Sequence, residues 1–159
     1  GPVPILNGTS NLAISRSVLS LLPQPLFQPE YGRSGGEDYD FFRRVARAGG
    51  KMAWCDEAVV IEPTPANRLT VGTLLSRYAN SGTYMARIDK SYDGRRAAWR
   101  ETARGLAGSV FKTARGVVCL DPDMIARGVL YTAHQAGRVA GMLGVTSARY
   151  AEPAPKRRT

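Results

Sequence analysis

The chain has 159 residues and a formal net charge of +9, so its length suits one domain with a modest hydrophobic core. Its two cysteines, Cys55 and Cys119, have no partner-like spacing and no histidine cluster beside them, which excludes a disulfide framework and a structural zinc site. We therefore expect a reducing, cytoplasmic setting, and the surplus of basic residues requires either an anionic partner or another explanation.

Short apolar runs predict three strands, at residues 12–14, 52–54 and 58–61. Three short strands make a poor free-standing sheet. We therefore expect strand edges and apolar surface that another part of the protein would normally cover.

An acidic turn precedes the first strong helical pattern, which covers residues 39–48. The turn consists of Gly35, Gly36, Glu37, Asp38, Tyr39 and Asp40. Paired glycines let the backbone come close to a ligand, and the free amides at a helix start keep a carboxylate such as Asp38 or Asp40 ionised. Such a cluster can supply a catalytic base. Simple capping of the helix explains the same residues.

Thr70 is the predicted N-cap of a helix over residues 71–88. Arg68 and Arg77 are nine residues apart, before this helix and on it, and they can converge on a phosphate. The planar guanidinium group suits that work because it donates two hydrogen bonds to one anion. An arginine pair at the surface or in salt bridges is the alternative explanation.

Residues 95–118 have the pattern of a basic amphipathic helix. Its apolar positions are Trp99, Ala103, Leu106, Val110 and Val117, and its basic positions are Arg96, Arg100, Arg104, Lys112 and Arg115. One possibility is that the helix lies in the interface of an anionic membrane. The other is that it covers the protein's own core and exposes its basic face to solvent.

The segment 124–143 predicts a further helix, which begins after Asp121 and Pro122. Its small residues form two neighbouring rows: Gly128, Thr132, Ala136 and Ala140, and beside them Ala133, Gly137 and Gly141. Such rows allow close helix packing, whereas the polar residues of the segment argue against a membrane span. We expect the helix to lie against 95–118 or on a bilayer surface, with His134 in a packed or interfacial role and not a catalytic one.

Several of these segments together resemble one known family. They are the run from Asn7 to Arg16, the Glu37–Asp38 pair that opens a helix, the strands at 52–54 and 58–61, the Arg68–Leu69–Thr70 run, and residues 77–82. In order and spacing they resemble the acceptor-side half of an inverting GT-A glycosyltransferase of family 2, over residues 5–90. Members of that group act in bacterial polysaccharide and lipid-linked sugar transfer.

The resemblance implies an α/β fold, the C-terminal half of a Rossmann-like GT-A domain followed by an amphipathic helical extension. The expected divisions are residues 1–90 for the acceptor-side portion, 91–148 for a basic helical region that contacts the inner face of the cell membrane, and 149–159 for a disordered basic tail. The donor-binding half, with its Asp-x-Asp motif, would precede residue 1. We therefore expect a fragment that is inactive by itself.

The resemblance also implies roles for individual residues. Asp38 would be the base that deprotonates the acceptor hydroxyl, and Glu37 would orient the loop. The predicted substrate-binding residues are Asn11, Gly35, Gly36, Asp40, Arg68 and Arg77. The substrates would be a nucleotide sugar and a saccharide or lipid-linked acceptor.

A divalent metal, Mn or Mg, would be bound mainly by the preceding half of the enzyme. Glu62 stands where many relatives carry a histidine near the metal, and a carboxylate is also a ligand for hard cations. A salt bridge to Arg68 or Arg77 explains Glu62 equally well.

Two other classes of function remain open from the residues. A nucleic-acid-binding module would explain the positive charge, but no aromatic stacking platform or recognition-helix motif accompanies it, so nucleic acid is not an expected partner. A non-catalytic membrane adaptor built from the helices at 95–143 is the other alternative.

Overall fold

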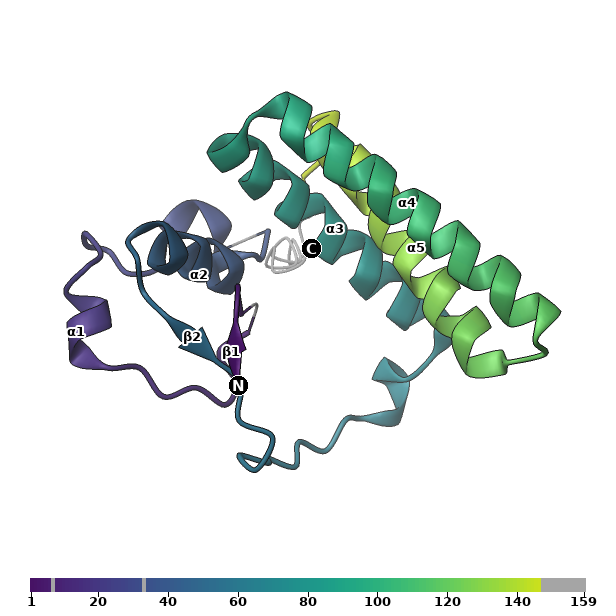
Figure 1. Cartoon of the computed structure of the whole chain (residues 1–159), viewed down its shortest axis with the longest axis horizontal. Coiled ribbons are helices and arrows are strands. Elements are labelled where there is room, and N and C mark those ends of the chain that lie inside the picture. The colour runs from purple at the N-terminus through teal and green to yellow at the C-terminus, as the bar shows by residue number, and fades with distance from the viewer. Residues whose placement is uncertain (7, 33, 147–159) are drawn as a thin grey trace, which may run out of the picture.

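The computed structural model describes residues 1–6, 8–32 and 34–146. The elements in chain order are β1 (Pro2–Val3), α1 (Arg16–Leu19), the 3-10 helix η1 (Pro29–Tyr31), α2 (Glu37–Arg47), β2 (Met52–Ala53), the 3-10 helix η2 (Ala66–Arg68), α3 (Val71–Asp93), α4 (Arg95–Val118) and α5 (Pro122–Met142). Figure 1 shows two lobes, one made by the short elements up to β2 and one by the long helices α3, α4 and α5.

The predicted α/β fold is wrong, because the described chain is mostly helical. Its one sheet consists of β1 and β2, two residues each, paired antiparallel. The predicted strands at 12–14 and 58–61 are not strands in the structure. Strand backbone needs a neighbouring strand for its hydrogen bonds, and no described segment offers one there. Val59 and Ile61 are accordingly 76% and 89% exposed.

The smaller lobe is held together by an apolar core under α2. Its buried side chains are Leu22, Phe41, Phe42 and Val45, and partly buried residues of the surrounding loops pack against them. Phe27 stacks on Phe41 with the ring centroids 5.1 Å apart. This core fixes α2 in a lobe that otherwise has little regular structure.

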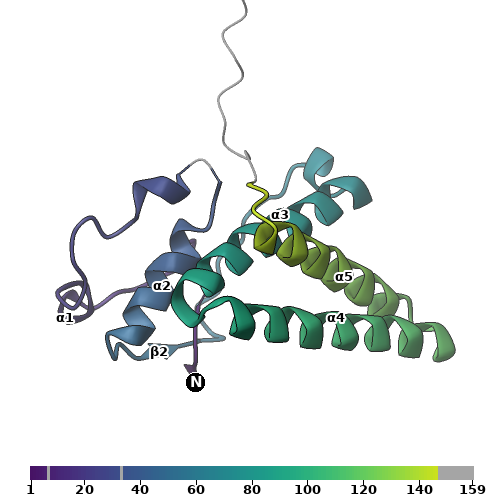
Figure 2. The same cartoon turned by 90° about the horizontal axis from the view of Figure 1, so that it is seen from above.

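The larger lobe is a three-helix bundle in which α5 packs along both α3 and α4. The cap residues predicted from the sequence are present: Thr70 Oγ1 accepts a hydrogen bond from Thr73 N at 3.2 Å, and Asp121 Oδ1 accepts one from Met124 N at 3.0 Å. Figure 2 shows α4 and α5 extending from the turn that joins them, and the two helices pack against each other. The packing of residues 124–143 against 95–118 is therefore confirmed.

Close backbone contacts explain why small residues recur in this bundle. A Cβ atom at Gly137 of α5 would fall well inside van der Waals contact of the Ala79 carbonyl oxygen of α3, and Gly82 meets the His134 carbonyl oxygen in the same way. On the other side of α5, Gly128 lies against Thr113 of α4. The small-residue rows thus serve helix packing inside the protein.

The structure also bears on the expected membrane contact and domain borders. Among the described helices, none is long and apolar enough to cross a membrane. The predicted border at residue 90 falls near the end of α3, and the division into domains stays a prediction. The predicted disordered tail, residues 149–159, lies outside the described residues.

Replacing Gly137 with Ala should destabilise the protein by about 2 kcal/mol or more, because the added methyl group meets backbone that cannot move aside alone. Gly108→Ala is the matched control. Gly108 lies in α4 with nothing within 4 Å of the added Cβ, so alanine should stabilise the helix by about 1 kcal/mol. Urea unfolding measures both values, and an equal effect of the two substitutions would contradict the close packing of α3 and α5.

Candidate functional site

The start of α2 is a tight turn that presses against α3. Gly35 and Gly36 have φ values of 77° and 104°, in the left-handed region that favours glycine. Gly36 is the N-cap residue, and a Cβ there would lie 2.7 Å from Cδ2 of Tyr84 in α3. The two glycines are both buried. They therefore serve the turn and the contact with α3.

The carboxylates of the first turn of α2 have three different surroundings. Asp38 is partly buried and accepts a hydrogen bond from Thr9 Oγ1 at 2.9 Å. The Oε2 atom of Glu37 is buried without a hydrogen-bond partner among the described residues. The N-cap residue is Gly36, which has no side chain to cap the helix.

Asp40 is held inside the protein. It is 1% exposed and accepts hydrogen bonds from Arg44 Nε at 2.9 Å and from Tyr92 Oη at 2.7 Å. Burial and the hydrogen bond to Asp40 raise the pKa of Tyr92 to about 12. Asp40 thus joins α2 to α3, and contact with a substrate would require it to leave both partners.

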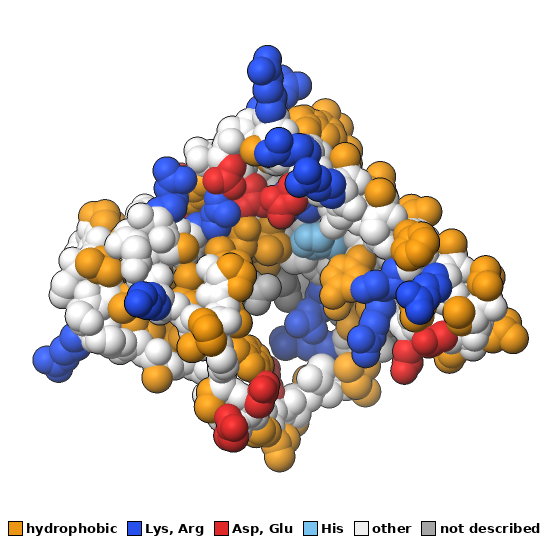
Figure 3. Space-filling view, in the orientation of Figure 1, with side chains coloured by type: hydrophobic (Ala, Val, Ile, Leu, Met, Phe, Trp, Pro, Cys, Tyr) orange, Lys and Arg blue, Asp and Glu red, His pale blue; other side chains and the backbone are white. Residues whose placement is uncertain are grey.

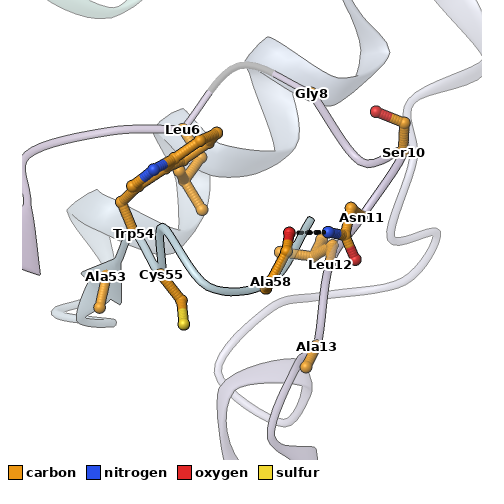
Figure 4. Close-up of a pocket in the computed structure, with 10 residues that line it drawn as sticks. All are labelled: Leu6, Gly8, Ser10, Asn11, Leu12, Ala13, Ala53, Trp54, Cys55 and Ala58. Atoms are coloured by element: carbon orange, nitrogen blue, oxygen red, sulfur yellow. Dashed lines mark hydrogen bonds between the residues drawn. The ribbon is translucent and has the colours of Figure 1, made fainter. Parts of the chain in front are cut away.

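A cleft lies beside the loop that holds Asp38. Its volume is about 430 Å³, and it is lined by Leu6, Gly8, residues 10–13, residues 53–55 and Ala58. Figure 4 shows Asn11 in its wall, where Nδ2 donates a hydrogen bond to the Ala58 carbonyl oxygen at 2.6 Å. Thr9, the partner of Asp38, lies between two of the lining residues, so the carboxylate is tied to the cleft wall.

Trp54 gives the cleft an exposed aromatic surface. Its side chain is 58% exposed, and its Nε1 donates a hydrogen bond to Asp56 Oδ1 at 2.6 Å. A second depression of about 320 Å³ shares Asn11 and Trp54 with the first and extends to Glu62. The two depressions together offer a groove with one aromatic face and several polar groups.

The structure brings only some of the predicted residues to this groove. Asn11 and Glu62 line it, and Asp38 is linked to it through Thr9. Arg68, in η2, and Arg77, in α3, are exposed, and neither is among the described residues that line the groove. Their convergence on a phosphate stays a prediction.

The described residues alone do not suit a divalent metal. Within residues 1–6, 8–32 and 34–146, no group of three or more His, Cys, Asp or Glu side chains comes together. Glu62 is exposed on an irregular segment. A hard cation needs several oxygen ligands, so a metal role for Glu62 would need ligands from elsewhere.

A buried polar network, which the sequence analysis missed, holds α2 against the three long helices. Asp89 of α3 is 1% exposed and accepts hydrogen bonds from Tyr39 Oη at 2.7 Å and from Arg138 Nη1 at 2.8 Å. Arg138 Nε also donates to Thr102 Oγ1 at 3.1 Å, and Arg43 Nη1 lies 3.9 Å from Asp89 Oδ1. The network therefore connects α2, α3, α4 and α5.

Two features connect this network to the candidate site and to the sequence. Burial and the hydrogen bond to Asp89 raise the pKa of Tyr39, which keeps its phenol protonated. Tyr39 directly follows Asp38, so its bond to α3 also fixes the first turn of α2. The available signal in the sequence was Arg138, a charged residue between the small residues Gly137 and Gly141.

Comparison with known proteins gives one similar relative. Over 141 residues, or 86% of this chain, the sequence is 37% identical to the succinoglycan biosynthesis protein ExoM of Rhizobium meliloti (strain 1021). The match covers 44% of that relative, so the chain spans less than half the length of the protein it matches. No protein-family profile matches the chain, and no solved structure matches it.

Replacing Arg138 with Met should lower the free energy of unfolding by about 3 to 5 kcal/mol, because it leaves the buried Asp89 carboxylate without its closest cation. Arg127→Met, at an exposed position of the same helix, should change stability by less than about 0.5 kcal/mol. Urea unfolding of the two variants tests the network. A loss of similar size in both would rule out a structural role for the Asp89–Arg138 pair.

The lowered pKa of His134 leads to a prediction of how the free energy of unfolding depends on pH. Burial and the charge of Arg138 lower its pKa, and its Nδ1 is hydrogen-bonded to Ser81 Oγ at 3.0 Å. In the unfolded chain the imidazole has its ordinary pKa of about 6.5. Below that pH the unfolded chain binds a proton that the folded protein does not bind, so the free energy of unfolding falls as the solution is acidified.

The replacement His134→Gln should remove this part of the pH dependence. The measurement is the free energy of unfolding at about pH 7.5 and about pH 5.5, on either side of the ordinary histidine pKa. The parent should lose more stability than the variant between the two conditions. Equal losses would show that His134 titrates alike in the folded and unfolded chains.

Proposed function

We propose that the protein takes part in polysaccharide biosynthesis as an inverting glycosyltransferase that moves a sugar from a nucleotide-sugar donor to a saccharide or lipid-linked acceptor. The name of the similar relative, a succinoglycan biosynthesis protein, supports the first part of this proposal. The resemblance of the acidic turn and its neighbouring segments to family 2 transferases supports the second. The proposal concerns this activity and does not include the GT-A fold.

The observation that carries the proposal is the position of Asp38. Its carboxylate lies in the first turn of α2. Its hydrogen bond from Thr9 holds it to the loop that lines the cleft. A carboxylate that is oriented by a hydrogen bond and linked to a groove in this way is the kind of group that a general base requires.

The acceptor sugar would lie in the groove beside Trp54. The exposed indole offers an apolar surface for a sugar ring, and Asn11 and Ser10 offer polar groups for its hydroxyls. This arrangement gives the groove the mixed character that carbohydrate binding requires. The donor would be held mainly by parts of the protein outside this chain.

In the proposed reaction, the acceptor hydroxyl oxygen forms a bond to the anomeric carbon of the donor sugar. The bond from that carbon to the diphosphate oxygen breaks, and the nucleoside diphosphate leaves with the electron pair. Asp38 takes the hydroxyl proton, because a neutral alcohol is a weak nucleophile. One displacement at the carbon inverts its configuration. Arg68 and Arg77 are the candidates for neutralising the leaving diphosphate.

In the full-length protein, replacing Asp38 with Asn should lower turnover by about 100-fold or more while donor binding changes little, because the amide has a similar size but cannot take up the proton. Asp123→Asn is the matched control, since Asp123 is an exposed carboxylate in the first turn of α5. The assay measures nucleoside diphosphate release from uridine and guanosine diphosphate sugars. Turnover within a few-fold of the parent would remove Asp38 from the role of base.

A further inference from the structure

The helix α4 buries small or polar side chains and exposes large apolar ones, which is the opposite of an ordinary bundle helix. The residues that it buries are small or polar: Ala98, Thr102, Ser109 and Gly116. Its large apolar residues from the middle of the helix to its C-terminal end are exposed instead. Their exposed fractions are 40% for Leu106, 54% for Val110, 68% for Phe111, 55% for Val117 and 82% for Val118.

These exposed residues form one continuous face. With 3.6 residues per turn, they fall within an arc of roughly 140° on the helix surface. Leu120, directly after the helix, is 86% exposed and extends the same apolar surface. Figure 3 shows hydrophobic side chains along the edge of the molecule where α4 runs, with Lys and Arg side chains next to them. We call residues 106, 110, 111, 117 and 118 the α4 apolar face.

Trp99 does not belong to this face, although the sequence pattern grouped it with Leu106 and Val110. It is partly buried and packs against Ala86, Ala98 and Met142. The amphipathic pattern therefore divides into two parts. One end of the helix packs into the bundle, and the other end presents apolar side chains to the outside.

Positive charge borders the α4 apolar face. Arg104 and Arg115 are exposed on the side of the helix next to Phe111. The helix carries six Lys or Arg residues and a single acid, Glu101, which lies 3.9 Å from Arg138. An apolar strip with a basic border suits a surface that combines hydrocarbon with negative charge.

We propose that the α4 apolar face binds the interface of an anionic lipid membrane, with α4 lying along the membrane surface. Phe111 and the valines would enter the boundary between headgroups and acyl chains, and Arg104 and Arg115 would contact the lipid phosphates. A second copy of the chain is a poorer occupant. It would bring together two basic borders on chains of net charge +9, and like charges oppose that contact.

This proposal is independent of sugar transfer, so its test uses binding alone. The full chain is mixed with vesicles of phosphatidylcholine, with or without phosphatidylglycerol, and sedimented at low and high salt. It should sediment with the phosphatidylglycerol vesicles and be released as salt rises, because screening acts within a Debye length. Absence of sedimentation at low salt would overturn the proposal.

Two variants locate the contact. The double replacement Phe111→Ser and Val118→Ser should weaken vesicle binding by about tenfold for each apolar side chain removed, with an unchanged melting temperature. The matched control is Val59→Ser with Ile61→Ser, which removes equally exposed apolar side chains away from α4 and should leave binding unchanged. Equal binding losses in the two double variants would overturn the assignment to α4.

A separate variant tests the charged border, and it also tests the proposal if the serine variant fails to fold. Arg104→Gln with Arg115→Gln should weaken binding to phosphatidylglycerol vesicles by about fivefold for each charge. Undiminished binding by this variant would contradict the proposal. Sedimentation velocity tests whether a second copy of the chain covers the α4 apolar face. A dimer that forms without lipid and is lost in the Phe111 and Val118 variant would assign the face to that second copy and overturn the membrane contact.

Discussion

The arrangement of the two lobes depends on one buried carboxylate, Asp89. A carboxylate in a protein interior is costly unless charged and hydrogen-bonding partners surround it. Tyr39 comes from α2 and Arg138 from α5, so the partners of Asp89 belong to both lobes. Around it, Arg43 also pairs with Asp93, and Arg43 and Arg47 lie over the Tyr92 ring. The orientation of α2, and with it the direction of the acidic turn, is thereby set by polar contacts with the bundle.

The two lobes are stabilised by different kinds of packing. In the smaller lobe, large side chains such as Phe41 and Phe42 form an apolar core under loops with little regular structure. In the bundle, Gly82 and Gly137 bring the backbones of α3 and α5 into direct contact, so many short contacts replace a few large side chains. A helical bundle beside a loop-rich lobe is a suitable support for a site, because loops that carry functional residues need a regular scaffold to position them.

Local signals in the sequence predicted where the helices start, but they did not predict the long-range polar contacts that the helices make. Thr70 and Asp121 mark helix starts through their own hydrogen bonds, which involve residues only three positions away. Asp89 and Arg138 are 49 residues apart, and Thr9 and Asp38 are 29 apart, so no local pattern indicates either contact. The predicted strand at 58–61 failed for a related reason, since strand formation requires a pairing partner elsewhere. The groove beside Asn11 likewise depends on how separate loops meet.

The inverted polarity of α4 follows from the way the bundle packs. Helix contacts as close as the one between Gly128 and Thr113 leave space for small side chains only, so large apolar residues are excluded from the inner face of α4 near these contacts. The helical period of apolar residues does not determine which face of the helix is buried. The assumption that the larger apolar residues form the inner face is wrong at Val110 and Phe111, which are exposed. The most exposed of the large apolar residues on the outer face, Phe111 and Val118, are 68% and 82% exposed and therefore bury little area in the bundle. Their presence along one basic-bordered strip is therefore better explained by a contact outside the chain than by folding.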